Sequence, residues 1–217
     1  YRFYANILYD GCTYRNHVMD IHYTNNKACV DLTAYGSAYS AGVSKTGYYM
    51  GKFIDKSQVI DNNDTYGSKQ NFIIWRYAEA LLDYAEVCYN LGNTALAKEY
   101  LNKTRQRVHM PDIDNVTMES IMNERRVEMA FEETTYWDLF RWGIAEEKMN
   151  GSSNPLKAMR VDVTTNGDVT TTKYTISNLN KSPEKVRYFT KRQYYLPLPW
   201  SEIKYHGIAQ NPDWTEQ

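Results

Sequence analysis

The residues whose types best suit acid–base chemistry are two adjacent glutamates, Glu132 and Glu133, in the run AFEETTYWDLFRWG. Paired carboxylates can serve as acid and base in glycoside cleavage when both face one substrate. Neighbouring helical residues point about 100° apart, so these two side chains do not share a substrate-facing surface. No nucleophile or other acid–base constellation occurs at usable spacing elsewhere in the sequence. We therefore predict no catalytic residues and no enzymatic activity.

Two other patterns raise the question of a bound cation. His17 and His22 are separated by only a few residues, but no third ligand lies near them in the sequence, which makes a poor metal site. The run Asp61-Asn62-Asn63-Asp64 has the appearance of a calcium loop. It lacks the glycine and the distal glutamate of an EF-hand, so we interpret it as a polar turn. We expect neither a metal nor a cofactor.

A further group of charged residues is better explained by structure than by catalysis. Glutamates and arginines alternate along a predicted helix that follows Thr117, and another arginine follows in the next helical segment. An arginine that faces a carboxylate with its fork of donors is a strong clamp when the pair is partly buried. We predict an ion network that locks this helix to its neighbours. Its expected members are Glu124, Arg126, Glu128 and Arg141.

Tyrosine is the most unusual feature of the composition, with 20 residues, accompanied by five tryptophans. A tyrosine ring combines an apolar face with a polar tip, which suits surfaces that bind polar, ring-shaped ligands. The tyrosines of the first 50 residues show no helical period and lie among Ser, Thr, Asn and Gly. We expect that any ligand contacts made by this chain come from these tyrosines. The candidate binding residues are Tyr14, Tyr23, Tyr35 and Tyr39.

The stretch from Asn71 to Gly143 predicts the helical framework of the chain. Apolar residues recur at three- and four-residue steps, and Gly92 and Pro111 interrupt the pattern. Small residues at the facing positions are typical of a tetratricopeptide-type helix–turn–helix repeat. We predict two antiparallel helices followed by a third, with Asn93 or Thr94 capping the second and Thr117 capping the third.

Two helical faces follow from the same spacing. The expected inner face of the first helix comprises Ile74, Tyr77, Ala78, Leu81, Ala85 and Cys88. The expected inner face of the second comprises Ala97, Tyr100, Leu101, Thr104 and Val108. Helical aromatics recur at core spacing, and we expect Trp75, Tyr77 and Trp137 to be used for packing rather than for ligand contacts.

The segments on either side of the repeat carry other patterns. Alternation from Arg2 to Tyr9 predicts a short strand. Asn166-Gly167 between two Thr/Val runs predicts an exposed two-stranded hairpin. The aromatic, Pro-punctuated segment after Tyr194 is expected to pack back over the helices as an extended strap.

Several blocks of the chain resemble the C-terminal half of the SusD/RagB family, the surface glycan-binding lipoproteins of Bacteroidetes-type uptake systems. They appear in family order and span nearly the whole chain. The chain departs from the family pattern at Glu133 and Thr135, where Gly and Arg are usual, and at Asp213, where Gly is usual. The matching blocks are residues 2–11 (RFYANILYDG), 76–86 (RYAEALLDYAE), 101–105 (LNKTR), 123–132 (NERRVEMAFE), 136–143 (YWDLFRWG), 194–199 (YYLPLP), 202–203 (EI) and 210–212 (QNP).

The resemblance implies a mainly α fold: a tetratricopeptide-like helical repeat with long irregular loops and a short β-hairpin, forming the C-terminal portion of one SusD-like domain. Met50–Ile54 resembles the short strand that precedes the repeat in the family, so a strand is expected there. Within residues 1–217 we expect an irregular aromatic-rich region (1–70), the helical repeat (71–149), a polar loop with the hairpin (150–193) and the C-terminal strap (194–217). The signal peptide, the lipid-bearing cysteine and the earlier repeats of such a protein would lie upstream, so we expect a fragment.

The resemblance also implies a function: capture of an oligosaccharide or polysaccharide at the outer face of the outer membrane and its transfer to a SusC-like TonB-dependent transporter. The alternative is a protein-interaction scaffold without a ligand of its own. The net charge of −1 does not favour nucleic acid or an anionic membrane as a partner. No apolar run approaches the ~20 residues of a membrane helix, so we expect membrane attachment only through an upstream lipid anchor.

The chain has three cysteines. Cys88 lies on the apolar helix face and is interpreted as a buried thiol. Cys12 and Cys29 could pair in an oxidising compartment, although their spacing does not require it.

Overall fold

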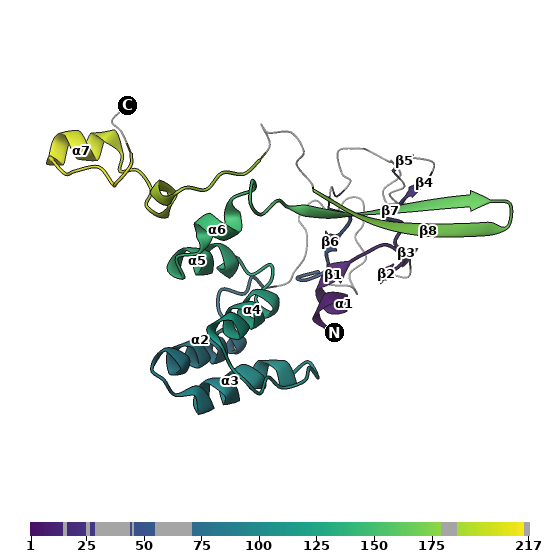
Figure 1. The fold of residues 1–217 in the computed structure, drawn as a ribbon, viewed down its shortest axis with the longest axis horizontal. Coiled ribbons are helices and arrows are strands. Elements are labelled where there is room, and N and C mark those ends of the chain that lie inside the picture. The colour runs from purple at the N-terminus through teal and green to yellow at the C-terminus, as the bar shows by residue number, and fades with distance from the viewer. Residues whose placement is uncertain are drawn as a thin grey trace. The chain divides into compact units, whose positions relative to one another are not determined.

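The computed structural model describes residues 1–14, 17–24, 27–28, 44, 46–54, 71–178 and 186–214. These residues form two compact units. Figure 1 shows the fold, with the ribbon coloured by residue number. The first unit comprises Tyr1–Thr135 and Ala158–Ser177, and the second comprises Tyr136–Lys157 and Asn178–Gln217. The helical repeat and the strands belong almost entirely to the first unit.

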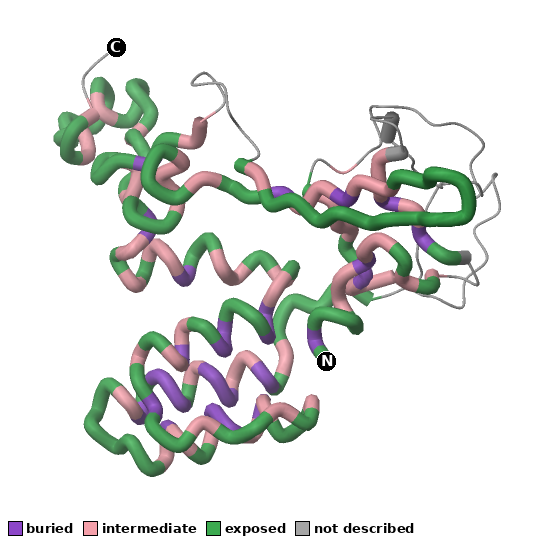
Figure 2. The backbone as a smooth tube through the Cα atoms, turned by 45° about the vertical axis from the view of Figure 1, so that its right-hand side comes forward, coloured by how far each residue is buried: buried purple, intermediate pink, exposed green. Residues whose placement is uncertain are grey.

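Three helices, α2 (Tyr77–Asn90), α3 (Thr94–Gln106) and α4 (Met118–Glu128), carry the core of the first unit. This arrangement confirms the helical framework predicted between Asn71 and Gly143. Figure 2 shows the buried positions in purple along these helices. The apolar side chains meet in one cluster, as expected for helices that each bury one stripe. The cluster consists of Leu82, Ala85, Cys88, Ala97, Leu101, Val116, Ile121 and Met129.

The ends of these helices follow the capping signals in the sequence. Gly92, with φ of +80°, follows α2 in the left-handed region that glycine favours. Its N–H donates to the carbonyl of Tyr89 at 3.0 Å, and the N–H of Asn93 donates to the carbonyl of Cys88 at 2.8 Å, which is the Schellman pattern. The side chain of Asn93 then caps α3, and Thr117 opens α4 with a capping box.

The inner face of α2 begins later than the periodicity predicted. Ala78, Leu81, Ala85 and Cys88 are buried, as is Leu82. Two further residues assigned to this face are exposed: Ile74 precedes the first turn of α2, and Tyr77 is its first residue. A regular spacing of apolar residues continues upstream of Tyr77, but the backbone there is not helical, so the spacing no longer corresponds to one face.

The strands of the described residues form three small sheets, with the orders β1-β6, β2-β3 and β5-β4-β7-β8. The predicted hairpin at Asn166-Gly167 is present as β7 and β8. It is not an isolated two-stranded element, because it forms part of the four-stranded sheet. β4 pairs in parallel with β7, placing Tyr23 opposite Asp162, and in antiparallel with β5. The strands are β1 (Ile7–Leu8), β2 (Thr13–Tyr14), β3 (His17–Val18), β4 (Tyr23–Thr24), β5 (Lys27–Ala28), β6 (Tyr49–Met50), β7 (Lys157–Asn166) and β8 (Val169–Asn178).

The first residues of the chain correct the sequence prediction of a strand from Arg2 to Tyr9. They form a short helix, α1 (Arg2–Asn6), and only Ile7–Leu8 is extended, as β1. The Arg2 side chain of α1 is buried and donates to Glu128 in α4. The local alternation of residues cannot indicate a contact with Glu128, which is distant in the sequence. The alternation alone therefore assigned this segment to a strand incorrectly. The strand expected at Met50–Ile54 is also wrong for most of its length, because β6 covers Tyr49–Met50 and residues 51–54 are not in a strand.

The second unit contains most of α5 (Thr134–Arg141), α6 (Ala145–Met149), the 3₁₀ helix η3 (Lys191–Tyr194) and α7 (Trp200–His206). The ring of Phe189, which is buried, packs edge-on against Phe140 and Tyr194, each with ring centroids 5.2 Å apart. The C-terminal segment is therefore not the fully extended strap that was expected, since the short helix α7 interrupts it.

Of the cysteines, Cys12 and Cys88 are free thiols, and Cys88 is buried in the core cluster as predicted. Because Cys12 is a free thiol, the disulfide with Cys29 that the sequence left open is not formed in this structure. Cys29 itself lies outside the described residues. Within the described part of the chain, no helix has the length and apolar character needed to cross a membrane.

Candidate functional site

The four tyrosines proposed from the sequence as ligand contacts have different positions. Tyr14 is partly buried at the end of β2, and Tyr23 lies in β4, in another sheet. The guanidinium of Arg160 stands 4.1 Å from the centre of the Tyr23 ring, so one ring face is already used by a cation. Tyr35 and Tyr39 fall outside the described residues.

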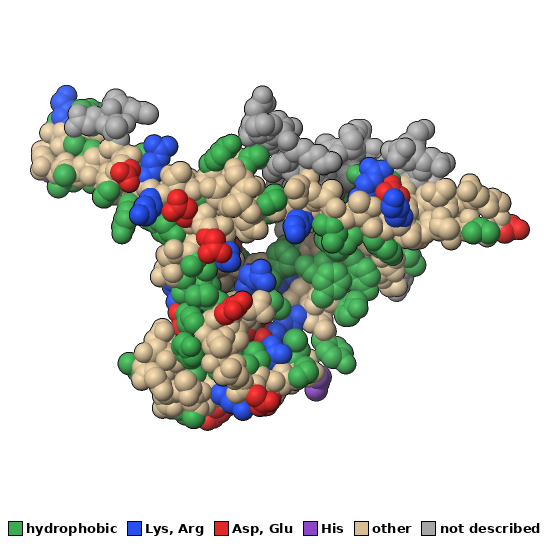
Figure 3. All heavy atoms as spheres, in the orientation of Figure 1, with side chains coloured by type: hydrophobic (Ala, Val, Ile, Leu, Met, Phe, Trp, Pro, Cys, Tyr) green, Lys and Arg blue, Asp and Glu red, His purple; other side chains and the backbone are tan. Residues whose placement is uncertain are grey.

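A different group of aromatic rings forms a surface cluster in the first unit, which we call the aromatic cluster: Phe3, Tyr4, Tyr9 and Tyr48. Phe3 is central, with ring centroids 5.5 Å from Tyr4, 5.3 Å from Tyr9 and 5.9 Å from Tyr48. Phe3 and Tyr4 remain 44% and 68% exposed. Figure 3 shows hydrophobic side chains gathered over the region where Figure 1 places α1, β1 and β6.

The misassigned N-terminal segment explains why the sequence did not reveal this cluster. On a strand, Phe3 and Tyr4 would point to opposite faces. On helix α1 their rings lie edge to face, 87° apart, and both contact Tyr9. Tyr48 arrives from a distant part of the chain and contacts Phe3. The density of aromatic residues in the first nine positions was the only available signal.

The helical aromatics were expected to be buried, and here the structure contradicts the prediction. Trp75, Tyr77 and Trp137 are 65%, 74% and 64% exposed. Trp75 and Tyr77 lie before or at the first turn of α2, beyond the packed stripe. Trp137 contacts the rings of Tyr136 and Phe140 on its own helix and leaves most of its surface open.

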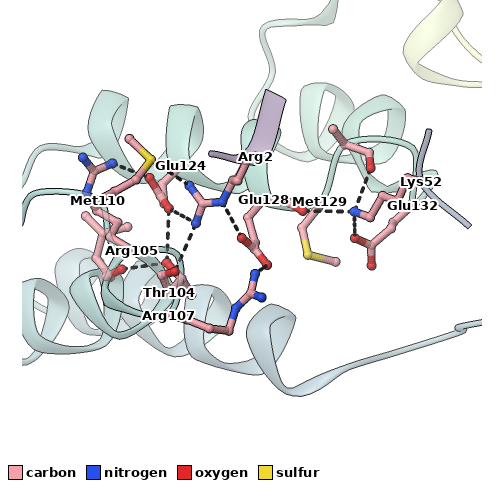
Figure 4. Close-up of polar contacts among 12 residues, drawn as sticks. Arg2, Lys52, Thr104, Arg105, Arg107, Met110, Glu124, Glu128, Met129 and Glu132 are labelled. Carbon is pink, nitrogen blue, oxygen red and sulfur yellow. Dashed lines mark hydrogen bonds and ion pairs between the residues drawn. The ribbon is translucent and has the colours of Figure 1, made fainter. Parts of the chain in front are cut away.

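The charged residues of the first unit form a compact network around α4, which we call the charge cluster (Figure 4). Its centre is the Glu128 carboxylate, which three arginines contact. Arg2 Nε donates to Oε2 at 2.7 Å, while Arg76 Nη1 and Arg107 Nη2 donate to Oε1 at 2.7 and 2.6 Å. Burial of one carboxylate requires such partners, because an unpaired buried charge is costly.

Glu124 lies one helical turn before Glu128, so both carboxylates leave α4 on the same side. Glu124 accepts from Arg105 Nη1 at 2.6 Å and from the hydroxyl of Thr104 at 3.3 Å, and it pairs with Arg2 Nη2 at 2.6 Å. Arg2 thus bridges both glutamates. Arg125 serves another side of α4, where it bonds to Glu79 and Asp83 of α2.

Glu132, the glutamate considered above for catalysis, belongs to the charge cluster as well. It accepts two hydrogen bonds from Arg76, at 2.6 and 2.7 Å, and one from Lys52. Burial raises the pKa of Glu132, but the hydrogen bonds from Arg76 and Lys52 outweigh it and lower the pKa overall. Burial lowers the pKa of Arg76, and its bonds to Glu132 and Glu128 raise it overall. A glycosidase acid needs a raised pKa, so the Glu132 environment is unsuited to that role.

The predicted ion network named two of these glutamates but not the cations that contact them. Arg126 is exposed and donates to the side chain of Asn123 at 3.0 Å. Arg141 bonds to Asp138 of its own helix at 2.8 Å. Among the described residues, no group of three or more His, Cys, Asp or Glu side chains is arranged to hold a metal ion.

A model of the SusD family matches residues 1–214 of this chain. The chain belongs to the SusD family. A SusD-like protein of Bacteroides ovatus is 25% identical over 70% of this chain and 32% of its own length. A solved SusD-like protein of Bacteroides fragilis is 27% identical, with a TM-score of 0.71 over 98% of this chain and 38% of its own. A solved SusD-like carbohydrate-binding protein of Bacteroides fragilis is also 27% identical, with a TM-score of 0.56, over 73% of this chain and 31% of its own.

The chain thus spans about a third of the length of these SusD-like relatives. Two of its departures from the family pattern have a common backbone property. Glu133 and Asp213 stand where the family usually has glycine, and both have a positive φ, of 62° and 65°. This left-handed region costs a residue with a Cβ about 1–2 kcal/mol. The backbone at these two positions therefore has the conformation that glycine favours.

Proposed function

We propose that this chain is the glycan-contacting part of a non-catalytic, cell-surface glycan-binding protein that passes oligosaccharide or polysaccharide to a SusC-like TonB-dependent transporter in the outer membrane. The observation that carries the proposal is the exposed aromatic cluster on a chain of the SusD family. Sugar rings present flat apolar faces bordered by hydroxyls, which aromatic rings with polar edges recognise.

The location of the rings supports this assignment. Phe3 and Tyr4 present exposed surface, while the rings of Tyr9 and Tyr48 pack against Phe3 at centroid distances of 5.3 and 5.9 Å. A platform whose rings are already fixed by neighbours loses little side-chain entropy when a ligand binds. Each stacking contact contributes about 1 kcal/mol, so two rings give weak capture, which suits a protein that must release its cargo.

The test is calorimetry of the full-length protein with a panel of neutral and acidic oligosaccharides. We expect Tyr4→Ala to weaken binding about five- to tenfold, the equivalent of one stacking contact. Tyr174→Ala is the matched control, since Tyr174 is similarly exposed (64%) but lies on β8 away from the aromatic cluster. Equal affinity of Tyr4→Ala and wild type for every bound glycan would reject the platform. The sequence-derived candidates are tested in parallel by Tyr23→Ala, Tyr35→Ala and Tyr39→Ala.

A second candidate function is protein interaction through the segment that leads into α2. Four apolar residues there are strongly exposed, and an apolar patch of this kind is typical of interaction sites. They are Phe72, Ile74, Trp75 and Tyr77, at 79%, 87%, 65% and 74%. Under this alternative, Trp75→Ala would abolish co-purification with the transporter while Tyr4→Ala would leave it intact.

A further inference from the structure

The charge cluster borders a pocket of about 300 Å³ in the first unit, and its lining is dominated by cations. A volume of this size lies at the lower end of the range for small-ligand sites, large enough for one sugar residue. The charged and titratable side chains that line it are Tyr1, Arg2, Lys52, Arg76, Arg107, His109 and Glu128.

The charges around the pocket do not balance. Arg2, Lys52, Arg76, Arg105 and Arg107 supply five positive charges to the charge cluster. The carboxylates that they contact are Glu124, Glu128 and Glu132, which supply three negative charges. All three carboxylates are at least 96% buried at the side chain, so water contributes little to this balance. A surplus of cations in a partly desolvated site favours a bound anion.

The hydrogen-bond donors identify where an anion would bind. Lys52 is engaged by the carbonyls of Glu128 and Ala130 and by Glu132, and Arg76 is engaged through all three of its nitrogens. Arg107 differs, because only its Nη2 bonds to Glu128 within the described part of the chain, and its side chain is 57% exposed. Its Nε and Nη1 make no hydrogen bond to the described part of the chain, and Arg107 is one of the residues that line the pocket.

His109 lies two residues beyond Arg107 on the same turn and also lines the pocket. Its ring packs edge-on against Tyr1, with centroids 6.4 Å apart. Helix α1 connects this pocket with the aromatic cluster, since Arg2, Ala5 and Asn6 line the pocket while Phe3 and Tyr4 belong to the cluster. A cationic pocket and an aromatic platform thus share one short helix.

We propose that this pocket binds an oxyanion carried by an acidic glycan, either the carboxylate of a uronic acid or a sulfate ester, with Arg107 as the principal donor. The inference rests on the proposed glycan-binding function and adds a substrate class to it. Guanidinium groups match the planar, bidentate geometry of carboxylates and sulfates, and such charge-assisted bonds are among the strongest in proteins.

The experiment titrates the full-length protein with sodium glucuronate, glucose 6-sulfate and glucose at constant ionic strength, followed by NMR of the arginine Nε–H signals. We expect the two anionic sugars to bind and to shift the Arg107 signal, and glucose to leave it unchanged. The relative affinities of the two anions identify which oxyanion the pocket prefers. Arg107→Gln should weaken their binding about tenfold, the effect of one charge-assisted bond.

Arg126→Gln is the control variant, because Arg126 is an exposed arginine of the same unit that lies outside the pocket lining. It should bind both anionic sugars like the wild type. His109→Ala provides a second pocket variant that leaves the charge cluster intact and should weaken binding less than Arg107→Gln.

Three outcomes would overturn the inference: no binding of either anionic sugar beyond glucose, equal binding by wild type and Arg107→Gln, or tighter Arg107-dependent binding of a blocked glutamate peptide, which would assign the pocket to a protein partner. The result is separable from the proposed function. Neutral glycans that bind through Tyr4 while the anions fail would reject only the oxyanion site. If the anions bind through Arg107 but Tyr4→Ala has no effect on the binding of any glycan, only the role of the aromatic cluster is rejected.

Discussion

Arg2 and Glu128 are 126 positions apart in the sequence, yet Arg2 Nε donates to Glu128 Oε2 at 2.7 Å with both side chains buried. The same guanidinium pairs with Glu124 and donates to the carbonyl of Thr104 at 3.1 Å. One residue of α1 therefore joins the N-terminal segment to both α3 and α4, and the aromatic cluster that α1 carries is positioned by this ion pair.

Removal of Arg2 should destabilise the protein strongly, because Arg2→Ala leaves two buried carboxylates with fewer partners. We expect a loss of about 3 kcal/mol in the free energy of unfolding, measured by urea denaturation of the full-length protein. Arg126→Ala, which removes an exposed arginine of α4, should change it by less than about 0.5 kcal/mol. If the two variants were equally stable, the bridging role of Arg2 would be wrong.

Glu132 should make the stability depend on pH in the acid range. Its pKa in the folded state lies below the ordinary value of 4.5, so the folded state binds fewer protons than the unfolded state there. The stabilisation is fully present above about pH 4.5 and is lost as the pH falls through the lowered pKa. Glu132→Gln should therefore be less stable than wild type at pH 7, and the difference should shrink at pH 3. A difference that stays constant across this range, followed by denaturant midpoints, would contradict the assignment.

Restoring glycine at the two left-handed positions should stabilise the protein. Glu133→Gly and Asp213→Gly each relieve a positive φ at a residue with a Cβ, and we expect gains of up to about 1 kcal/mol in the free energy of unfolding. Glu99→Gly, in the interior of α3, is the control and should destabilise by about 1 kcal/mol, since glycine there costs helix propensity. Thermal melts of the three variants measure these changes in stability. If Glu133→Gly or Asp213→Gly lost as much stability as Glu99→Gly, the argument from backbone strain would be wrong.

The sequence by itself determined the features that depend on neighbouring residues. Gly92, Asn93 and Thr117 mark helix ends because a backbone turn or a side-chain cap needs only a few adjacent residues. Asn166-Gly167 set the hairpin for the same reason, and the spacing from Ala78 to Cys88 set one face of α2. The order of short motifs along the chain was sufficient to indicate the SusD family.

Only the tertiary structure decided which distant residues meet. The partners of Glu128 come from Arg2, Arg76 and Arg107, on three separate segments, and no local pattern distinguishes these arginines from Arg126. The aromatic cluster depends on α1 being helical, and the burial of Arg2 that accompanies this helix requires carboxylates more than 100 residues away. Charge pairing and ring contact act through space, so their partners become known only when the chain has folded.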